Sequence, residues 1–304
     1  MLKGKALTKG SIIGIIAPSS PEDKDIINEK INQFSSMGFN VKLGKHLYNS
    51  HGYLAGYDQE RARDITDMFL DSSIDGIVCF RGGYGSIRTL PYINPKVIKK
   101  NPKFFCGYSD ITILLNYFAK LGLITFHGPM INSDFTNEET LKSFLSISSS
   151  PSNIIYNLNE YNNIFYINPN SFSGKIVGGN LSVICSSIGT SFEINTKNSI
   201  LLLEDINEPP YSIDRMLTQL LYGKKLDSCR GIILGSFKGC DLPNYSRSLC
   251  LKEIILDRLE ALDIPIITGF PFGHSYPNIT IPIGCKGHFS CENKTLKTLD
   301  TCLT

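Results

Sequence analysis

The chain opens with a strand, a helix and a second strand in close succession, and this order restricts its fold strongly. Residues 11–20 are a β-branched apolar run closed by a proline and two serines, as is typical of a buried parallel strand. Residues 23–37 have helical spacing, and residues 39–43 form a second apolar run. A β-α-β unit has parallel strands and a right-handed crossover. The sequence therefore predicts an α/β fold whose amino-terminal part is a mainly parallel sheet flanked by helices.

The 304 residues are enough for two domains. Residues 133–170 are rich in asparagine and serine, and the clearest change in composition is at 148–153. We predict an amino-terminal domain over 1–160, a linker over 161–173 and a carboxyl-terminal α/β domain, rich in strands, over 174–304. The alternating tail from residue 281 to 303 predicts short antiparallel strands.

Charge and cysteine content exclude several classes of function. The formal net charge is +2, with 30 basic and 28 acidic residues, so neither a nucleic acid nor an anionic membrane is expected as a partner. No apolar stretch approaches the ~18–20 residues of a membrane span, and the first residues lack the apolar core of a signal peptide, so a cytoplasmic location is expected. The nine cysteines occur singly, which predicts reduced thiols rather than a disulfide or zinc framework.

The stretch 103–112 predicts a reactive serine. An apolar run ends at Gly107, and a helical apolar pattern begins two residues after Ser109. A serine on such a strand-to-helix turn exposes its hydroxyl beside the free N–H groups of the helix, as in a nucleophile elbow. Two alternatives stay open: Ser109 or Asp110 could simply cap the helix, or Cys106 could be the nucleophile, although a thiol in an apolar run is more often inert.

A glycine-rich loop follows the predicted strand at 76–80. Its sequence, Arg81-Gly82-Gly83-Tyr84-Gly85, permits positive φ angles and lets backbone N–H groups face a ligand. Dinucleotide binding is disfavoured because neither G-x-G-x-x-G nor G-K-[ST] is present. A plain tight turn is the alternative interpretation.

Ser109, Glu204 and His274 share one property: each lies at or just past the carboxyl end of a predicted strand. Ligands of open α/β sheets bind beyond these strand ends. A serine needs an imidazole to take its proton, and the imidazole needs a carboxylate to fix its tautomer. From the residues alone, His127 competes for the role of base, and Glu208 competes for the role of carboxylate.

The chain resembles the LD-carboxypeptidases of serine peptidase family S66, a group that also holds the microcin C immunity peptidases. The matching segments run in order through nearly the whole chain: 16–20, 81–85, 107–110, 126–129, 178–181, 203–205, 210–215, 273–274 and 282–284.

The resemblance implies a two-domain enzyme that needs no metal or cofactor and is cytoplasmic and homodimeric, with the nucleophile on the amino-terminal domain. The implied catalytic triad is Ser109, Glu204 and His274. The implied oxyanion hole consists of the backbone N–H groups of Asp110 and of Gly83 or Gly82.

The resemblance also implies the substrate, a cytoplasmic muropeptide whose L,D bond before a terminal D-alanine is cut through an acyl-enzyme during peptidoglycan recycling. Arg81 and Tyr84 are candidates for substrate binding, since arginine suits a free carboxylate, although a structural salt bridge is an alternative role for Arg81. One alternative function is a microcin-C-immunity-type peptidase that hydrolyses aminoacyl-nucleotide conjugates. The chain has no tryptophan and is compact, which favours the muropeptide. The other alternative is a catalytically silent α/β ligand-binding protein.

Overall fold

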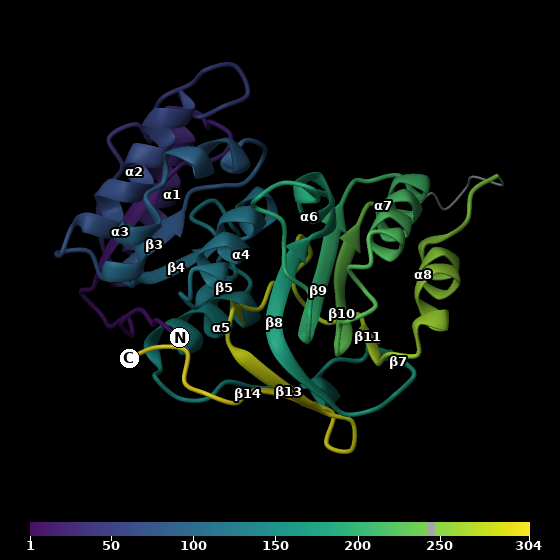
Figure 1. Ribbon diagram of the computed structural model, residues 1–304. Coiled ribbons are helices and arrows are strands. Elements are labelled where there is room, and N and C mark those ends of the chain that lie inside the picture. Colours follow the sequence, from purple (N-terminus) through teal and green to yellow (C-terminus); the bar gives the residue numbers. More distant parts are fainter. Residues whose placement is uncertain (242–246) are drawn as a thin grey trace. The chain divides into compact units, whose positions relative to one another are not determined.

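The structure is a computed structural model that describes residues 1–241 and 247–304. The chain forms two compact units, each built on one β-sheet (Figure 1). The first unit consists of residues 1–152, 279–284 and 301–304, and the second of residues 153–278 and 285–300. This confirms the predicted fold class, an α/β protein with a mainly parallel amino-terminal sheet and a carboxyl-terminal α/β part rich in strands.

The sheet of the first unit has six strands in the order β12-β5-β4-β3-β1-β2. Their bounds are β1 Ile12–Ile16, β2 Asn40–Leu43, β3 Gly76–Cys79, β4 Phe104–Gly107, β5 Thr125–His127 and β12 Ile281–Ile283. The strands β1 to β5 are parallel to their neighbours, and β12 is antiparallel to β5. The predicted β-α-β start of the chain is therefore confirmed.

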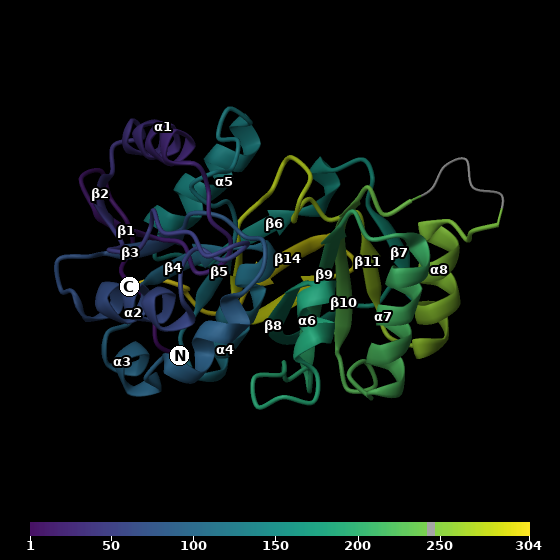
Figure 2. The same cartoon turned by 90° about the horizontal axis from the view of Figure 1, so that it is seen from above.

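Helices cover both faces of this sheet (Figure 2). On one face lie α1 (Lys24–Ser35) and α5 (Glu138–Ser149), and on the other α2 (Asp58–Leu70), α3 (Pro95–Lys100) and α4 (Thr112–Lys120). Short 3₁₀ helices, η1 (Ser86–Tyr92) and η2 (Ser109–Ile111), follow β3 and β4. Aromatic contacts fix each layer: the rings of Phe34 and Phe144 are 6.0 Å apart, and those of Phe69 and Phe118 are 5.5 Å apart.

The helix α5 was not predicted, because it lies in the asparagine- and serine-rich stretch. Its start has a clear signal, since the Asn137 side chain accepts a hydrogen bond from the Thr140 N–H and caps the helix. Phe144 and Ile147 form its buried side. The helix was missed because the serines on its exposed side make the average composition of the stretch polar.

The sheet of the second unit has eight strands in the order β6-β14-β13-β8-β9-β10-β11-β7. Strands β8 to β11 are parallel, and the outer pairings are antiparallel. Their bounds are β6 Ile155–Asn157, β7 Phe165–Ile167, β8 Phe172–Asn180, β9 Ser199–Ile206, β10 Gly231–Lys238, β11 Ile266–Thr268, β13 Lys286–Ser290 and β14 Thr295–Thr298. The short antiparallel strands predicted for the tail are confirmed as β12, β13 and β14.

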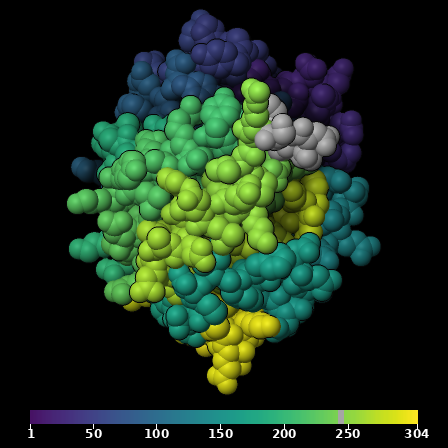
Figure 3. Space-filling model, turned by 90° about the vertical axis from the view of Figure 1, so that its right-hand side faces the viewer, coloured from purple at the N-terminus to yellow at the C-terminus, as the bar shows by residue number. Residues whose placement is uncertain are grey.

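One face of the second sheet is covered by α6 (Leu181–Ser187), α7 (Pro210–Tyr222) and α8 (Leu251–Leu259), as Figure 2 shows. Their apolar side chains pack on β8 to β11 in one core cluster that includes Leu201, Leu217 and Ile254. Two 3₁₀ helices complete the unit, η3 (Leu158–Glu160) and η4 (Glu260–Leu262). The turn between β13 and β14, coloured yellow, projects from the bottom of Figure 3.

The segment expected to be a linker, 161–173, carries the whole of β7 and the start of β8. Because β7 pairs with β11, this segment forms one edge of the second sheet. The strand β7 has only three residues, and asparagines lie close to it on both sides with a proline just after it, so the segment resembles a linker in composition. Among the described residues, no helix combines the length and apolar character needed to cross a bilayer.

Candidate active site

Ser109 occupies a strained backbone position at the end of β4. The strand stops at Gly107, Tyr108 is extended with φ −151°, and Ser109 has φ 61° before the chain enters η2 and α4. A left-handed conformation at a non-glycine residue costs about 1–3 kcal/mol and often marks a functional site. Ser109 is partly exposed. The predicted strand-to-helix turn is therefore present, and its strain falls on the serine itself.

The helix-capping alternative does not describe this turn. Ile111 is the N-cap residue of α4, and no side-chain hydrogen bond caps the described start of that helix or of η2. The Asp110 carboxylate turns instead toward other loops: its Oδ2 accepts hydrogen bonds from Ser19 Oγ (2.6 Å) and from the Ser86 N–H (2.8 Å).

The glycine loop after β3 passes directly beside Ser109. A Cβ atom on Gly82 would lie 2.7 Å from Ser109 Cβ and 2.8 Å from Ser109 Oγ, which no real Cβ tolerates. Gly83 has φ 126°, and a Cβ there would meet Ser20 Oγ at 2.1 Å. The same Cβ on Gly82 would lie 3.4 Å from the backbone nitrogen of Asp110. The loop therefore needs glycine in order to approach the serine and the first amide after it.

Arg81 and Tyr84 have different surroundings. Arg81 Nη1 donates to Glu22 Oε2 at 2.6 Å, so its charge is already paired within the first unit. Tyr84 is 51% exposed, and its ring lies 5.9 Å from that of Tyr53, which is 65% exposed. The two neighbouring rings therefore form an exposed aromatic surface beside the glycine loop.

His274 and Glu204 form a hydrogen-bonded pair in the second unit. His274 Nδ1 lies 2.7 Å from Glu204 Oε2, and the Glu204 side chain has no exposed surface. A carboxylate accepts hydrogen bonds, so it selects the tautomer with the proton on Nδ1 and leaves Nε2 basic. The pair has the orientation that a general base and its supporting carboxylate require.

The loop before His274 reaches Glu204 because it contains a glycine. Gly273 has φ 103°, and a Cβ there would lie 2.5 Å from Glu204 Oε2. The strand β9 continues to Ile206, so Glu204 lies inside the strand rather than at its end as predicted. The next residue of the strand, Asp205, is also buried. Its carboxylate accepts hydrogen bonds from Asn180 Nδ2 (3.1 Å) and from the Ser182 N–H (2.8 Å), which compensate for the loss of water.

The rival residues have surroundings that do not favour the proposed roles. His127 is in β5 of the first unit, has no exposed surface, and its ring lies 5.9 Å from that of Tyr108. It is Glu204, and not Glu208, that the structure pairs with His274. Burial raises the pKa of the Cys106 thiol far above its ordinary value, so this residue stays protonated and is a poor nucleophile.

A separate cavity of about 520 Å³ lies in the second unit. Side chains of β7, β10, β11 and α8 line it, among them Phe165, Leu234 and Ile255. None of the predicted site residues lines this cavity. Within the described ranges, no group of three His, Cys, Asp or Glu side chains is arranged to hold a metal ion.

Comparison with known proteins identifies the family. Residues 13–128 match the LD-carboxypeptidase N-terminal domain, and residues 173–289 match the LD-carboxypeptidase C-terminal domain. The chain belongs to the LD-carboxypeptidase family, peptidase S66. It is 40% identical, over 96% of its length and 93% of the relative, to the probable murein peptide carboxypeptidase of Bacillus subtilis (strain 168). The predicted family is confirmed, and the chain is a peptidase.

Two solved structures of family members have the same fold. The microcin C7 self-immunity protein MccF in complex with glutamyl sulfamoyl guanosine is 26% identical with a TM-score of 0.91, and the match covers 100% of both chains. The muramoyltetrapeptide carboxypeptidase from Oxalobacter formigenes is 29% identical with a TM-score of 0.84, covering 97% of this chain and 100% of the other.

Proposed function

We propose that this LD-carboxypeptidase family member is a serine enzyme that hydrolyses the L,D bond before the terminal D-alanine of a muropeptide. The observation that carries the proposal is the strained, partly exposed Ser109 against the backbone of Gly82. The hydrogen-bonded pair of His274 and Glu204 supports it, because a serine hydroxyl is unreactive without such a base. The murein-related names of the Bacillus and Oxalobacter relatives support the choice of substrate.

In the proposed mechanism, His274 Nε2 takes the proton of Ser109 as its Oγ attacks the carbonyl carbon before D-alanine. The backbone N–H groups of Asp110 and of Gly82 or Gly83 stabilise the oxyanion, a contribution worth about 10²–10³ in rate for each donor. Glu204 supports the imidazolium, which then protonates the departing amine of D-alanine. Water attacks the acyl-enzyme, releases the tripeptide and restores the Ser109 hydroxyl.

Substrate recognition is proposed to involve Tyr84, whose exposed ring continues the glycine loop. Arg81 would bind a substrate carboxylate only by sharing or releasing Glu22, because that ion pair already exists. A cytoplasmic, homodimeric enzyme of peptidoglycan recycling, without metal or cofactor, belongs to the same proposal.

The direct test is release of D-alanine from a muramoyl tetrapeptide by the purified protein. We expect turnover by the wild type and a loss of about 10⁴-fold or more in kcat for Ser109→Ala, with an unchanged melting temperature. A fluorophosphonate should label Ser109 in the wild type, and peptide mass spectrometry would identify the labelled residue. Wild-type activity in the Ser109→Ala variant would disprove the serine mechanism.

A second candidate rests on the likeness to the MccF structure, which covers the full length of both chains. In that case the protein would hydrolyse an aminoacyl-nucleotide conjugate. A panel of tetrapeptide, pentapeptide and a hydrolysable aminoacyl-nucleotide analogue separates the two functions by their kcat/KM values. A silent ligand-binding protein would turn over none of the three.

A further inference from the structure

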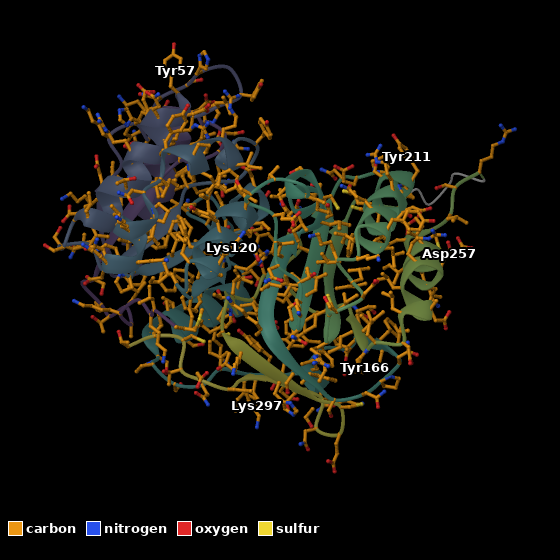
Figure 4. The ribbon with its side chains drawn as sticks, in the orientation of Figure 1. Tyr57, Lys120, Tyr166, Tyr211, Asp257 and Lys297 are labelled. Carbon is orange, nitrogen blue, oxygen red and sulfur yellow. The ribbon has the colours of Figure 1, made fainter. Side chains whose placement is uncertain are left out.

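A buried arginine in the first unit takes no part in the proposed chemistry. Arg61 lies in α2, a helix whose start is marked by the labelled Tyr57 in Figure 4, and only 1% of Arg61 is exposed. Burying a guanidinium is costly unless every donor finds an acceptor. Its position therefore needs an explanation from its partners.

Those partners are the carbonyl groups of two loops that follow strands. Arg61 Nη1 donates to the carbonyl oxygen of Pro18, in the loop after β1, and to that of Gly85, in the loop after β3, at 2.9 Å. Its Nη2 is paired with Asp58 on the same helix at 2.5 Å. One nitrogen, Nη1, thus ties both loops to one point, while Nη2 and Nε, which donates to the Gly56 carbonyl at 3.3 Å, hold the guanidinium in place. A lysine, with a single nitrogen, could not keep the bridge and these further contacts together.

The residue after each of these carbonyls binds Asp110. Ser19 follows Pro18, and its Oγ donates to Asp110 Oδ2 at 2.6 Å. Ser86 follows Gly85; its N–H donates to the same oxygen at 2.8 Å, and its Oγ lies 2.8 Å from Ser19 Oγ. Ser19 and Ser86 have no exposed surface, and Asp110 is 4% exposed. A carboxylate that accepts two buried hydrogen bonds is held firmly in place.

Asp110 is the residue directly after strained Ser109. A left-handed serine persists only if the surrounding structure determines it more strongly than local preference opposes it. We propose that Ser19, Ser86 and Arg61 are positioning residues that act through the Asp110 carboxylate. They hold Ser109 at its left-handed φ and aim the Asp110 N–H at the developing oxyanion. This inference rests on the proposed serine mechanism.

The test compares Ser19→Ala with Ser148→Ala. The control removes another buried hydroxyl of the first unit, whose Oγ donates to the Leu145 carbonyl in α5. Both variants should lose similar stability. We expect Ser19→Ala to lower kcat on the tetrapeptide about 10–100-fold with KM within about threefold, because a displaced oxyanion donor affects the transition state alone. Ser148→Ala should stay within about twofold of wild type in kcat.

Two further variants keep the inference testable if Ser19→Ala does not fold. Ser19→Thr restores the donor and should recover most of kcat. Arg61→Lys keeps the charge but loses the Nη2 and Nε contacts to Asp58 and Gly56 that orient the bridging nitrogen, and it should lower kcat by about tenfold. A purely structural role would give no recovery in Ser19→Thr beyond the recovery in melting temperature, and that result would overturn the inference.

The rate of Ser109 labelling by a fluorophosphonate separates this inference from the proposed function. If the wild type is not labelled at Ser109, the serine mechanism fails, and this inference fails with it. If the wild type is labelled and folded Ser19→Ala is labelled at the same rate with the same kcat, the positioning role alone is wrong. Labelling that slows about 10–100-fold in Ser19→Ala, but not in Ser148→Ala, supports it.

Discussion

In the first unit, Ser109 is positioned by its own backbone, whereas in the second unit His274 is positioned by another side chain. Ser109 has φ 61°, and the amide after it is fixed through the buried carboxylate of Asp110. His274 is oriented by its hydrogen bond of 2.7 Å to Glu204. The difference fits the proposed roles: a nucleophile and an oxyanion donor need fixed backbone atoms, while a base needs a fixed ring and tautomer.

Both regions use glycine for close approach, but for different targets. Gly82 brings backbone against the serine, and Gly273 brings backbone against the Glu204 carboxylate. Substitutions at these places therefore test whether each region is held by the means described. The following predictions run from the largest expected effect to the smallest.

Substitution of Glu204, which supports His274 in the second unit, should cause the largest loss of activity. Glu204→Gln keeps the shape but removes the negative charge that supports the imidazolium, so we expect kcat to fall by about 10⁴-fold, with KM little changed. The matched control is Glu208→Gln, which changes a partly exposed carboxylate nearby and should retain activity. Equal activity of the two variants on the tetrapeptide would assign no role to the Glu204 charge.

Substitution of Gly82, whose backbone lies against Ser109 in the first unit, should cause the second largest loss of activity. Gly82→Ala adds a Cβ only 2.8 Å from Ser109 Oγ, so either the serine or the loop must move, and we expect kcat/KM to fall about 10²–10³-fold. Gly122→Ala is the contrasting control, because its Cβ meets open space while its φ of 103° strains an alanine. That control should lose stability and keep activity; the reverse pattern would contradict the role given to Gly82.

The neighbouring carboxylate Asp205 should affect stability rather than turnover. Burial raises the pKa of Asp205 to about 6 from 3.8, with a smaller contribution from nearby Glu204. Because the folded state holds the proton more tightly, this contribution to stability is complete below about pH 4 and is lost as pH rises through about 6. The stability of wild type relative to Asp205→Asn should fall by about 3 kcal/mol across that range. Urea denaturation between pH 4 and pH 8 measures it, and parallel stability curves would contradict it.

The exposed aromatic surface of the first unit should give the smallest effect. Tyr84→Ala removes one ring of the pair with Tyr53, so we expect KM for the tetrapeptide to rise about tenfold with kcat within about threefold. Tyr92→Ala, which removes a tyrosine with the same 51% exposure, is the control and should leave KM unchanged. A fall in kcat at constant KM would indicate that Tyr84 supports the glycine loop instead of the substrate.

The sequence predicted those parts of the fold and candidate site that local pattern encodes. The turn at Ser109 follows a strand, a glycine and a helical pattern, so it could be located without coordinates. Gly82 lies in a loop whose sequence predicted special backbone, but only the structure shows which atoms it faces, and the close approach at Gly273 was not predicted. The pairing of His274 with Glu204 follows from tertiary structure, so the sequence alone could not exclude the rival residues His127 and Glu208.

The supporting network could not be predicted from the sequence. Arg61, Ser19 and Ser86 come from three segments, and hydrogen bonds between distant loops leave no periodicity in the chain. An arginine in a helix normally indicates an exposed face, so burial of Arg61 contradicts the usual expectation. The signal that remained was the pair Ser19 and Ser20 after β1, which lies in the first segment that resembles the family, 16–20.

The strand β12 has a consequence for synthesis of the protein. It covers the edge of β5, yet its residues 281–283 leave the ribosome long after residues 125–127 and after most of the second unit. Until then β5 is an uncovered edge strand of a parallel sheet, open to pairing with other nascent chains. A carboxyl-terminal truncation that removes β12 would make this vulnerable intermediate permanent, so aggregation, rather than loss of catalysis, would be its first visible defect.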